Sequence, residues 1–153
     1  MLEEFRAMSQ RDPLAPAVRE LLRDPLDGRA KLWTVWRALQ CRREYERLFR
    51  QSEYLAVQAR GAAARHALAF ARRADDGGVL VATGRLYASL APRAGELPLG
   101  AEVWGDAALD VRFLPADTRL TNVLTGETLA PQDGAIPLAA LFAHFNAALL
   151  CWR

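Results

Sequence analysis

The residues able to do chemistry are few and scattered in this sequence. The two histidines, His66 and His144, lie far apart, and neither stands at a metal-ligand spacing from a cysteine or a carboxylate. Zinc sites draw on such spacings, so we predict no metal site. The two cysteines, Cys41 and Cys151, do not make a disulfide framework. Free cysteines are usually buried, so we predict two buried, reduced thiols.

The acidic residues indicate turns and caps rather than catalysis. Asp75 and Asp76 precede Gly77-Gly78, a combination typical of a tight turn. Asp106 and Asp110 lie where a loop meets a predicted strand, and no acid or base stands with them to complete a glycosidase pair. The sequence also lacks a glycine cluster of the phosphate-binding kind. We therefore predict no catalytic, cofactor-binding or metal-binding residue in this chain.

Aromatic side chains are the more informative set. Tyr54, Tyr87 and Trp104 could form a platform on which a sugar ring stacks, as exposed rings do in carbohydrate-binding modules. Trp33 and Trp36 lie on a long predicted helix and could contact a partner. The apolar neighbours of these rings equally fit a position in the core or at an interface. Sugar stacking and interface packing both remain open for Trp33, Trp36, Tyr54 and Trp104.

The charge balance argues against nucleic acid as a partner. The net charge is +2, from 20 basic and 18 acidic residues, and no basic stripe of the kind that nucleic-acid binders show is present. Arg42, Arg43 and Arg47 interleave with Glu44 and Glu46, a pattern typical of a solvated, ion-paired helix face. No run of about 18 apolar residues could span a membrane. With no signal-peptide pattern at its start, we expect a cytoplasmic protein.

The element that must position the aromatic residues is a predicted helix over 27–51. Its front half, from Leu32 to Leu39, is apolar on almost every side, whereas its back half keeps one apolar stripe. A helix that is apolar all round has to be covered all round. We therefore expect the β part of the chain to cover one side. Residues 16–23, or a second copy of the chain, are expected to cover the other.

The remaining pattern divides the chain at about residue 52. Before it, further helices are predicted, while after it the apolar period changes from helical to alternating, with hairpin signals at residues 75–78 and 125–126. Pro92 to Gly105 reads as a loop. The fold class is therefore α+β, with a helical segment over 1–52 and an antiparallel β-sandwich over 53–153. The predicted helices are 2–9, 16–23, 27–51 and 137–145, and the predicted strands are 54–59, 65–72, 79–83, 86–90, 107–113, 118–124, 127–130 and 147–152.

Several short motifs, taken in order, resemble a known family. They resemble the last barrel helix and the C-terminal region of bacterial maltooligosyltrehalose synthases, and they cover most of the chain from about Leu14 to its end. Each motif alone is short, and it is their common order that carries the resemblance. The motifs are Asp27-Gly28-Arg29, Lys31-Leu32, Thr34, Trp36-Arg37-Ala38-Leu39, Arg42-Arg43, Tyr54-Leu55, Ala69-Phe70-Ala71-Arg72-Arg73, Pro98-Leu99-Gly100, Val103-Trp104-Gly105-Asp106 and Asn122-Val123-Leu124-Thr125-Gly126-Glu127.

The resemblance implies an enzyme larger than this chain. The family belongs to the α-amylase clan of glycoside hydrolases and converts the reducing-end α-1,4 linkage of a maltooligosaccharide to the α,α-1,1 linkage of trehalose. Its catalytic carboxylates lie at strand ends of a (β/α)₈ barrel, which needs at least about 200 residues. No catalytic residue of the family can be transferred to a position here. The resemblance therefore implies a non-catalytic C-terminal part, inactive alone.

Two other hypotheses remain beside this one. The chain could be a free-standing carbohydrate-binding β-sandwich that binds maltooligosaccharide, or a module that oligomerises through the 27–51 helix. The expected partner is accordingly a catalytic barrel supplied in cis or in trans, or a second copy of the chain.

Overall fold

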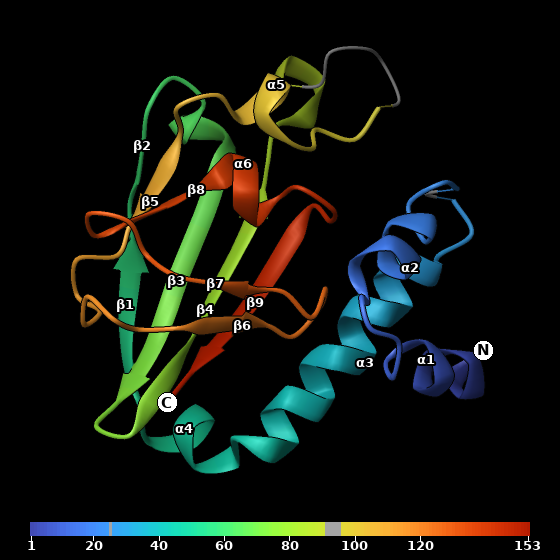
Figure 1. The fold of residues 1–153 in the computed structure, drawn as a ribbon, viewed down its shortest axis with the longest axis horizontal. Helices are drawn as coiled ribbons and strands as arrows, with labels where there is room; N and C mark the ends of the chain where they lie inside the picture. The colour runs from blue at the N-terminus through green and yellow to red at the C-terminus, as the bar shows by residue number, and fades with distance from the viewer. Residues whose placement is uncertain (25, 91–95) are drawn as a thin grey trace.

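The computed structural model describes residues 1–24, 26–90 and 96–153 (Figure 1). Helices occupy the N-terminal third, and two antiparallel sheets follow, so the predicted α+β class with a β-sandwich is confirmed. The N-terminal helices lie together on one side of the larger sheet, and α3 (Arg29–Glu44) runs between that sheet and the two short helices α1 (Leu2–Met8) and α2 (Ala15–Glu20).

The predicted helix over 27–51 is two helices. α3 ends at Glu44, and α4 (Glu46–Gln51) begins after Tyr45, whose φ of −108° and ψ of 35° leave the helical region. The bend turns the buried side chain of Leu48 toward the sheet, where α4 lies against β3 (Ala67–Ala74). The chain then becomes extended at Ser52, which is the predicted change from helix to strand.

The larger sheet has six strands in the order β1-β3-β4-β9-β6-β7, and all neighbours are antiparallel. The predicted hairpin at residues 75–78 is confirmed, because Ala74 of β3 pairs with Gly77 of β4 and leaves Asp75 and Asp76 as the turn. The other strands of this sheet are β1 (Glu53–Val57), β4 (Gly77–Gly84), β6 (Leu120–Asn122), β7 (Thr128–Leu129) and β9 (Ala147–Trp152).

The smaller sheet has the order β2-β5-β8, formed by β2 (Ala59–Arg60), β5 (Ala108–Asp110) and β8 (Ala135–Pro137). The predicted strand over 54–59 is therefore wrong as one element, since the chain leaves the larger sheet after Val57 and enters the smaller one at Ala59. The start of the helix predicted over 137–145 is also wrong. Pro137 still belongs to β8, and α6 covers only Leu138–Leu141.

Two segments differ in type from the prediction. The predicted strand over 86–90 is wrong, because Tyr87–Ser89 form the 3-10 helix η2 after Leu86 takes a positive φ of 57°. The Tyr87 hydroxyl then donates to the Asn146 carbonyl at 3.3 Å, which ties this turn to the residue before β9. The predicted loop over 92–105 contains the helix α5 (Ala101–Trp104), while its residues 92–95 lie outside the described residues. Likewise, the second predicted strand starts late, because residues Ala64–His66 form the 3-10 helix η1.

The central strands of the larger sheet, β4 and β9, are buried on both faces. Neighbouring residues of a strand point to opposite faces, and in β4 the side chain of Val79 joins the helices while that of Leu80 joins the core between the two sheets. In β9 the same division separates Leu149 from Leu150. This double burial explains why both strands read as continuous apolar runs. The helices and the smaller sheet therefore share the larger sheet as their common support.

Candidate functional site

The helix α3 is held on the sheet by three side chains of one face. The Trp33 indole N–H donates to the carbonyl of Leu124 at 3.0 Å, and the Arg37 guanidinium donates to the carbonyl of Val123 at 2.8 Å. Cys41 completes the row, with its Sγ 3.4 Å from Sγ of Cys151 in β9. Residues four apart lie on one helix face, so this stripe gives α3 a fixed orientation on the sheet.

The turn that receives α3 follows β6 and is organised by Asn122. The Asn122 side-chain oxygen accepts the backbone N–H of Leu124 at 3.1 Å and that of Leu149 at 3.4 Å. Gly126, with a φ of 80°, closes the turn by donating its N–H to the Asn122 carbonyl at 2.7 Å. These bonds free the carbonyls of residues 123 and 124 for the side chains of α3.

The N-terminal helices cover the Trp33 side of α3. Phe5 packs edge-on against Trp33 with ring centroids 5.4 Å apart, and Trp36 lies 5.4 Å from Trp33 in the same cluster. Val18 and Leu21 are buried in that cluster too. The prediction that residues 16–23 cover one side of the helix is therefore confirmed, and α1 adds to this cover through Phe5.

The opposite side of α3 is uncovered. Leu32, Val35 and Leu39, which we call the α3 stripe, are 37%, 46% and 58% exposed. The β part and residues 16–23 therefore do not cover these three residues within one chain, and cover by a second copy of the chain stays a prediction. Their spacing of three and four residues aligns them on one helix face. Apolar side chains aligned on an exposed face indicate an interaction surface.

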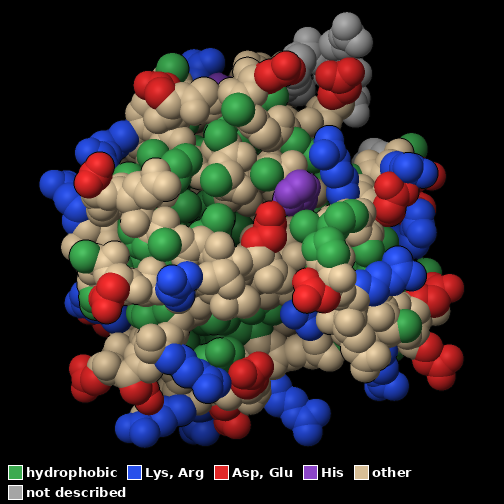
Figure 2. Space-filling model, in the orientation of Figure 1, with side chains coloured by type: hydrophobic (Ala, Val, Ile, Leu, Met, Phe, Trp, Pro, Cys, Tyr) green, Lys and Arg blue, Asp and Glu red, His purple; other side chains and the backbone are tan. Residues whose placement is uncertain are grey.

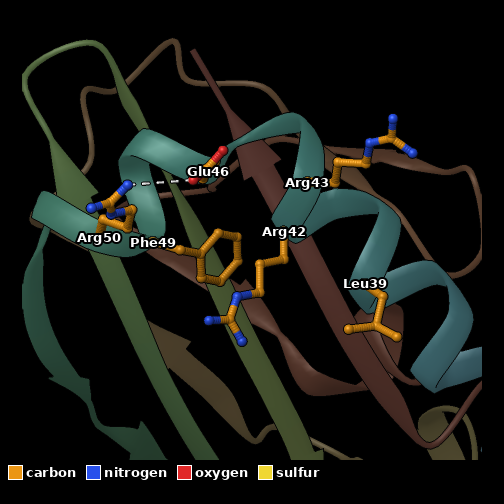
Figure 3. A pocket seen from close by; sticks show the side chains of 6 residues that line it. All are labelled: Leu39, Arg42, Arg43, Glu46, Phe49 and Arg50. Atoms are coloured by element: carbon orange, nitrogen blue, oxygen red, sulfur yellow. Dashed lines mark hydrogen bonds and ion pairs between the residues drawn. The ribbon is translucent and has the colours of Figure 1, made fainter.

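A shallow groove continues the α3 stripe toward α4 (Figure 3). It has a volume of about 300 Å³ and is lined by Leu39, Arg42, Arg43, Glu46, Phe49 and Arg50. Figure 3 shows the Phe49 ring and the Arg42 side chain next to each other at its centre, with Leu39 on the neighbouring part of α3. Arg50 and Glu46 form an ion pair at 3.5 Å along its rim. The surface therefore combines an apolar stripe with a charged border, as partner-binding surfaces do.

The remaining aromatic candidates do not form one platform. Trp104 is buried, where its indole N–H donates to the Pro98 carbonyl at 2.9 Å and its ring packs on Phe142. Tyr54 is 61% exposed and stacks on Phe70 with centroids 5.4 Å apart. Tyr87 is half-buried at the end of β4. Of the candidate rings, Tyr54 alone offers a widely exposed face, because Trp33 and Trp104 are enclosed.

The histidines and carboxylates take structural positions. His66 is buried, and its Nε2 accepts a hydrogen bond from Arg65 at 3.0 Å, while His144 faces Glu127 at 3.3 Å. Asp110 binds Arg112, and these hydrogen bonds lower the pKa of the Asp110 carboxyl to about 2. Among the described residues, no group of three His, Cys, Asp or Glu side chains could hold a metal ion.

For the two cysteines, the burial was predicted but the contact between them was not. Both thiols are free and buried, as predicted. Their contact was not foreseen, because 110 residues separate them and only the docking of α3 on β9 brings them together.

The surface charges are mixed in sign. Figure 2 shows Lys and Arg side chains interspersed with Asp and Glu across one face of the molecule. Within residues 1–24, 26–90 and 96–153, no helix combines the length and the apolar composition needed to cross a membrane.

Comparison with known proteins gives one informative match. No protein-family model matches the sequence, and no curated protein matches it. A solved structure of a mutant maltooligosyltrehalose synthase from Arthrobacter ramosus matches 90% of this chain with 34% sequence identity and a TM-score of 0.60. The chain is similar to one part of a larger enzyme. It spans 17% of the length of that synthase.

This match agrees with the resemblance found in the sequence motifs. The structure also brings two of those motifs into contact, because Arg37 of the helix motif binds the carbonyl of Val123 in the turn motif. The neighbouring bond from Trp33 to Leu124 joins the same two segments. The motifs therefore belong to one packed unit rather than to independent pieces.

Proposed function

We propose that this chain is the non-catalytic C-terminal part of a maltooligosyltrehalose synthase and supports a catalytic barrel supplied by another segment or another chain. The observation that carries the proposal is the 34% identity to that enzyme over 90% of the chain, combined with a span of 17% of the enzyme's length. Activity of the complete enzyme, conversion of a terminal α-1,4 linkage to α,α-1,1, would then depend on residues outside this chain.

The α3 stripe supports this proposal and suggests where the barrel binds. Leu32, Val35 and Leu39 are apolar, aligned and exposed, while the other side of α3 is already docked on the sheet. Burying exposed apolar area contributes about 25 cal/mol per Å², so a barrel helix packed on this stripe would stabilise the assembly. In this proposal α3 is the last helix of the outer helical ring of the barrel. The β-sandwich packs against α3 and supports it.

A chimera tests the proposal. The matching segment of the Arthrobacter ramosus synthase is replaced by this chain, and trehalose-linkage formation from maltoheptaose is measured. We expect activity in the chimera and a loss of about tenfold or more on Leu39→Asp, because a charge buried at an interface costs several kcal/mol. Leu68→Asp is the matched control, since Leu68 is a similarly exposed leucine on β3, at 55%. An inactive but folded chimera would count against the proposal.

A carbohydrate-binding sandwich is the second candidate function, favoured by the exposed Tyr54 ring stacked on Phe70. A sugar face could pack on such a ring. The test is a titration of the pure chain with maltoheptaose, in which the NMR signals of the Tyr54 ring are monitored. The Tyr54→Ala variant is the control. Unchanged signals, with no retention on amylose, would remove this candidate.

Self-association is the remaining alternative, favoured by the same α3 stripe. Sedimentation of the pure chain over a range of concentrations decides it, with Leu39→Asp as the variant that should dissociate a dimer. A monomer at every concentration would leave the stripe to a different partner.

A further inference from the structure

The two buried cysteines form a contact that none of the functions above uses. Cys41 lies on α3 and Cys151 on β9, and both side chains are nearly fully buried, at 2% and 6% exposure. Their sulfur atoms are 3.4 Å apart. A disulfide bond is about 2.05 Å long, so the sulfurs have to approach by only about 1.3 Å to bond.

The cysteine pair lies at the wall of a cavity between α3 and the turn after β6. The cavity has a volume of about 330 Å³, and its lining includes Arg37, Tyr45, Asn122 and both cysteines. It is open at the surface through polar residues such as Gln40 and Glu44. The two cysteines therefore line a space large enough for a molecule of a few heavy atoms.

An unpartnered amide also belongs to this cavity. Asn122 is 1% exposed, and its side-chain oxygen accepts two backbone N–H groups, whereas its Nδ2 has no hydrogen-bond partner among the described residues. A buried donor without a partner is costly and calls for an explanation. A small polar molecule in the cavity, such as a hydroperoxide, would supply the missing acceptor.

The electrostatic setting makes the two thiols unequal. Either thiol can donate the hydrogen bond between them. This bond lowers the pKa of Cys41, which burial and Glu44 raise, and it raises the pKa of Cys151. The guanidinium of Arg37, one helical turn before Cys41, adds a further lowering through its positive charge. A thiolate is the nucleophilic form of cysteine, so we expect Cys41, one helical turn after Arg37, to be the attacking sulfur and Cys151 the resolving one.

We propose that Cys41 and Cys151 form a reversible dithiol site that hydrogen peroxide or an organic hydroperoxide oxidises to a disulfide. The Cys41 thiolate attacks one peroxide oxygen, the O–O bond breaks, and the second oxygen leaves as hydroxide or alkoxide, giving a sulfenic acid. The Cys151 sulfur then displaces the sulfenic hydroxyl, its proton leaves with that group as water, and the S–S bond forms. Two thiols are oxidised, and one peroxide is reduced to water or to an alcohol and water.

The disulfide would join two parts of the molecule that otherwise meet only through packing and hydrogen bonds. It would bind α3 to β9 across 110 residues of chain. A cross-link over so long a loop restricts the unfolded chain strongly, so we expect the melting temperature to rise by roughly 5 to 15 °C on oxidation.

The test uses the full chain, whose only cysteines are these two. The reduced protein is treated with one equivalent of hydrogen peroxide and analysed by intact mass, thiol counting after denaturation, and peptide mapping without reductant. We expect loss of both thiols, a mass lower by about two hydrogens, a peptide pair joined through Cys41 and Cys151, and full reversal by dithiothreitol. The melting temperature should rise as stated and return on reduction.

Two variants test the assigned roles. In Cys151→Ala, peroxide should leave a sulfenic acid at Cys41 that dimedone traps. Cys41→Ala should react more slowly, since burial and Glu44 still raise the pKa of the remaining Cys151 thiol. Oxygen addition without loss of both hydrogens, disulfides between chains, or unreactive thiols in the wild-type chain would overturn the proposal. Faster reaction of Cys41→Ala than of Cys151→Ala would overturn the order of attack.

Discussion

Trp33 joins the helices to the sheet through both its ring and its indole N–H. The ring is fully buried against Phe5, and the N–H donates to Leu124. We expect Trp33→Ala to lower the free energy of unfolding by about 3 to 5 kcal/mol through the cavity it leaves. Trp33→Phe should cost about 1 to 3 kcal/mol, because the Leu124 carbonyl then loses its donor.

Denaturant unfolding of the variants measures both values. Leu39→Ala is the matched control on the exposed side of α3, where a change within about 0.5 kcal/mol is expected. A Trp33→Phe variant as stable as the wild type would show that the bond to Leu124 contributes nothing to the docking of α3.

Asp110 provides a pH prediction at the same scale. Its hydrogen bonds from the Arg112 side chain and backbone lower the carboxyl pKa from 3.8 to about 2. Because the folded pKa lies below the unfolded one, this contribution to stability is present above pH 3.8 and is lost as the pH falls through about 2. An NMR titration of the Asp110 carboxyl carbon measures it directly, and Arg112→Gln should return the pKa toward its ordinary value. A wild-type midpoint near 4 would contradict the bond geometry.

Residue types predicted turns and burial better than they predicted contacts between residues far apart in the sequence. The turn at Asp75-Asp76 and the burial of both thiols followed from local pattern. The contact between Cys41 and Cys151 did not, because it depends on how α3 is placed on the sheet. The aromatic candidates show the same limit, since an apolar neighbourhood does not tell whether a ring such as Trp104 faces a core or a solvent groove.

At the scale of elements, α1 depends mainly on one buried side chain, with Met8 packed beside the same cluster. It has seven residues, and Phe5 is its buried side chain. Phe5→Ala removes packing worth about 3 to 5 kcal/mol, and two helical turns are not stable alone in water. We therefore expect α1 to detach while the sheet stays folded.

Tryptophan fluorescence measures this change, because the loss of Phe5 uncovers Trp33 and Trp36. The emission should shift to the red and acrylamide should quench it more strongly, whereas Glu3→Ala, on an exposed position of α1, should change neither. Unaltered quenching in Phe5→Ala would mean that α2 alone protects the cluster.

The type of an element was predictable where its apolar pattern extended over many residues, and it was ambiguous where the pattern was short. The helical pattern over 27–51 and the apolar runs of β4 and β9 were read correctly as helix and strands. The break at Tyr45 is a tertiary effect, because it serves the packing of Leu48 on the sheet and leaves no mark such as a proline. Residues 86–90 have the composition of a strand, but Leu86 in the left-handed region and the bond from Tyr87 to Asn146 turn the chain away.

For the whole molecule, the larger sheet decides how the parts unfold. Its central strands send Leu80 and Leu150 into the core between the sheets, and Val79 and Leu149 into the core under the helices. Residue 52 is where the chain changes from helices to strands. It does not separate two independent cores, because both cores lie on opposite faces of the same strands. Loss of either core would expose one face of β4 and β9 to water, at about 25 cal/mol per Å² of apolar surface.

We therefore expect the full chain to unfold in one cooperative transition. The helical circular dichroism signal, which reports mainly α3, and the fluorescence of the four tryptophans, which are shared between the helices and the sandwich, should change at the same temperature. Hydrogen exchange should likewise give similar protection to the buried amides of α3 and of β4. Loss of the helical signal at a lower temperature than the rest would show that the sandwich is stable without α3. In that case the helices would depend for their full stability on the partner that covers Leu32, Val35 and Leu39.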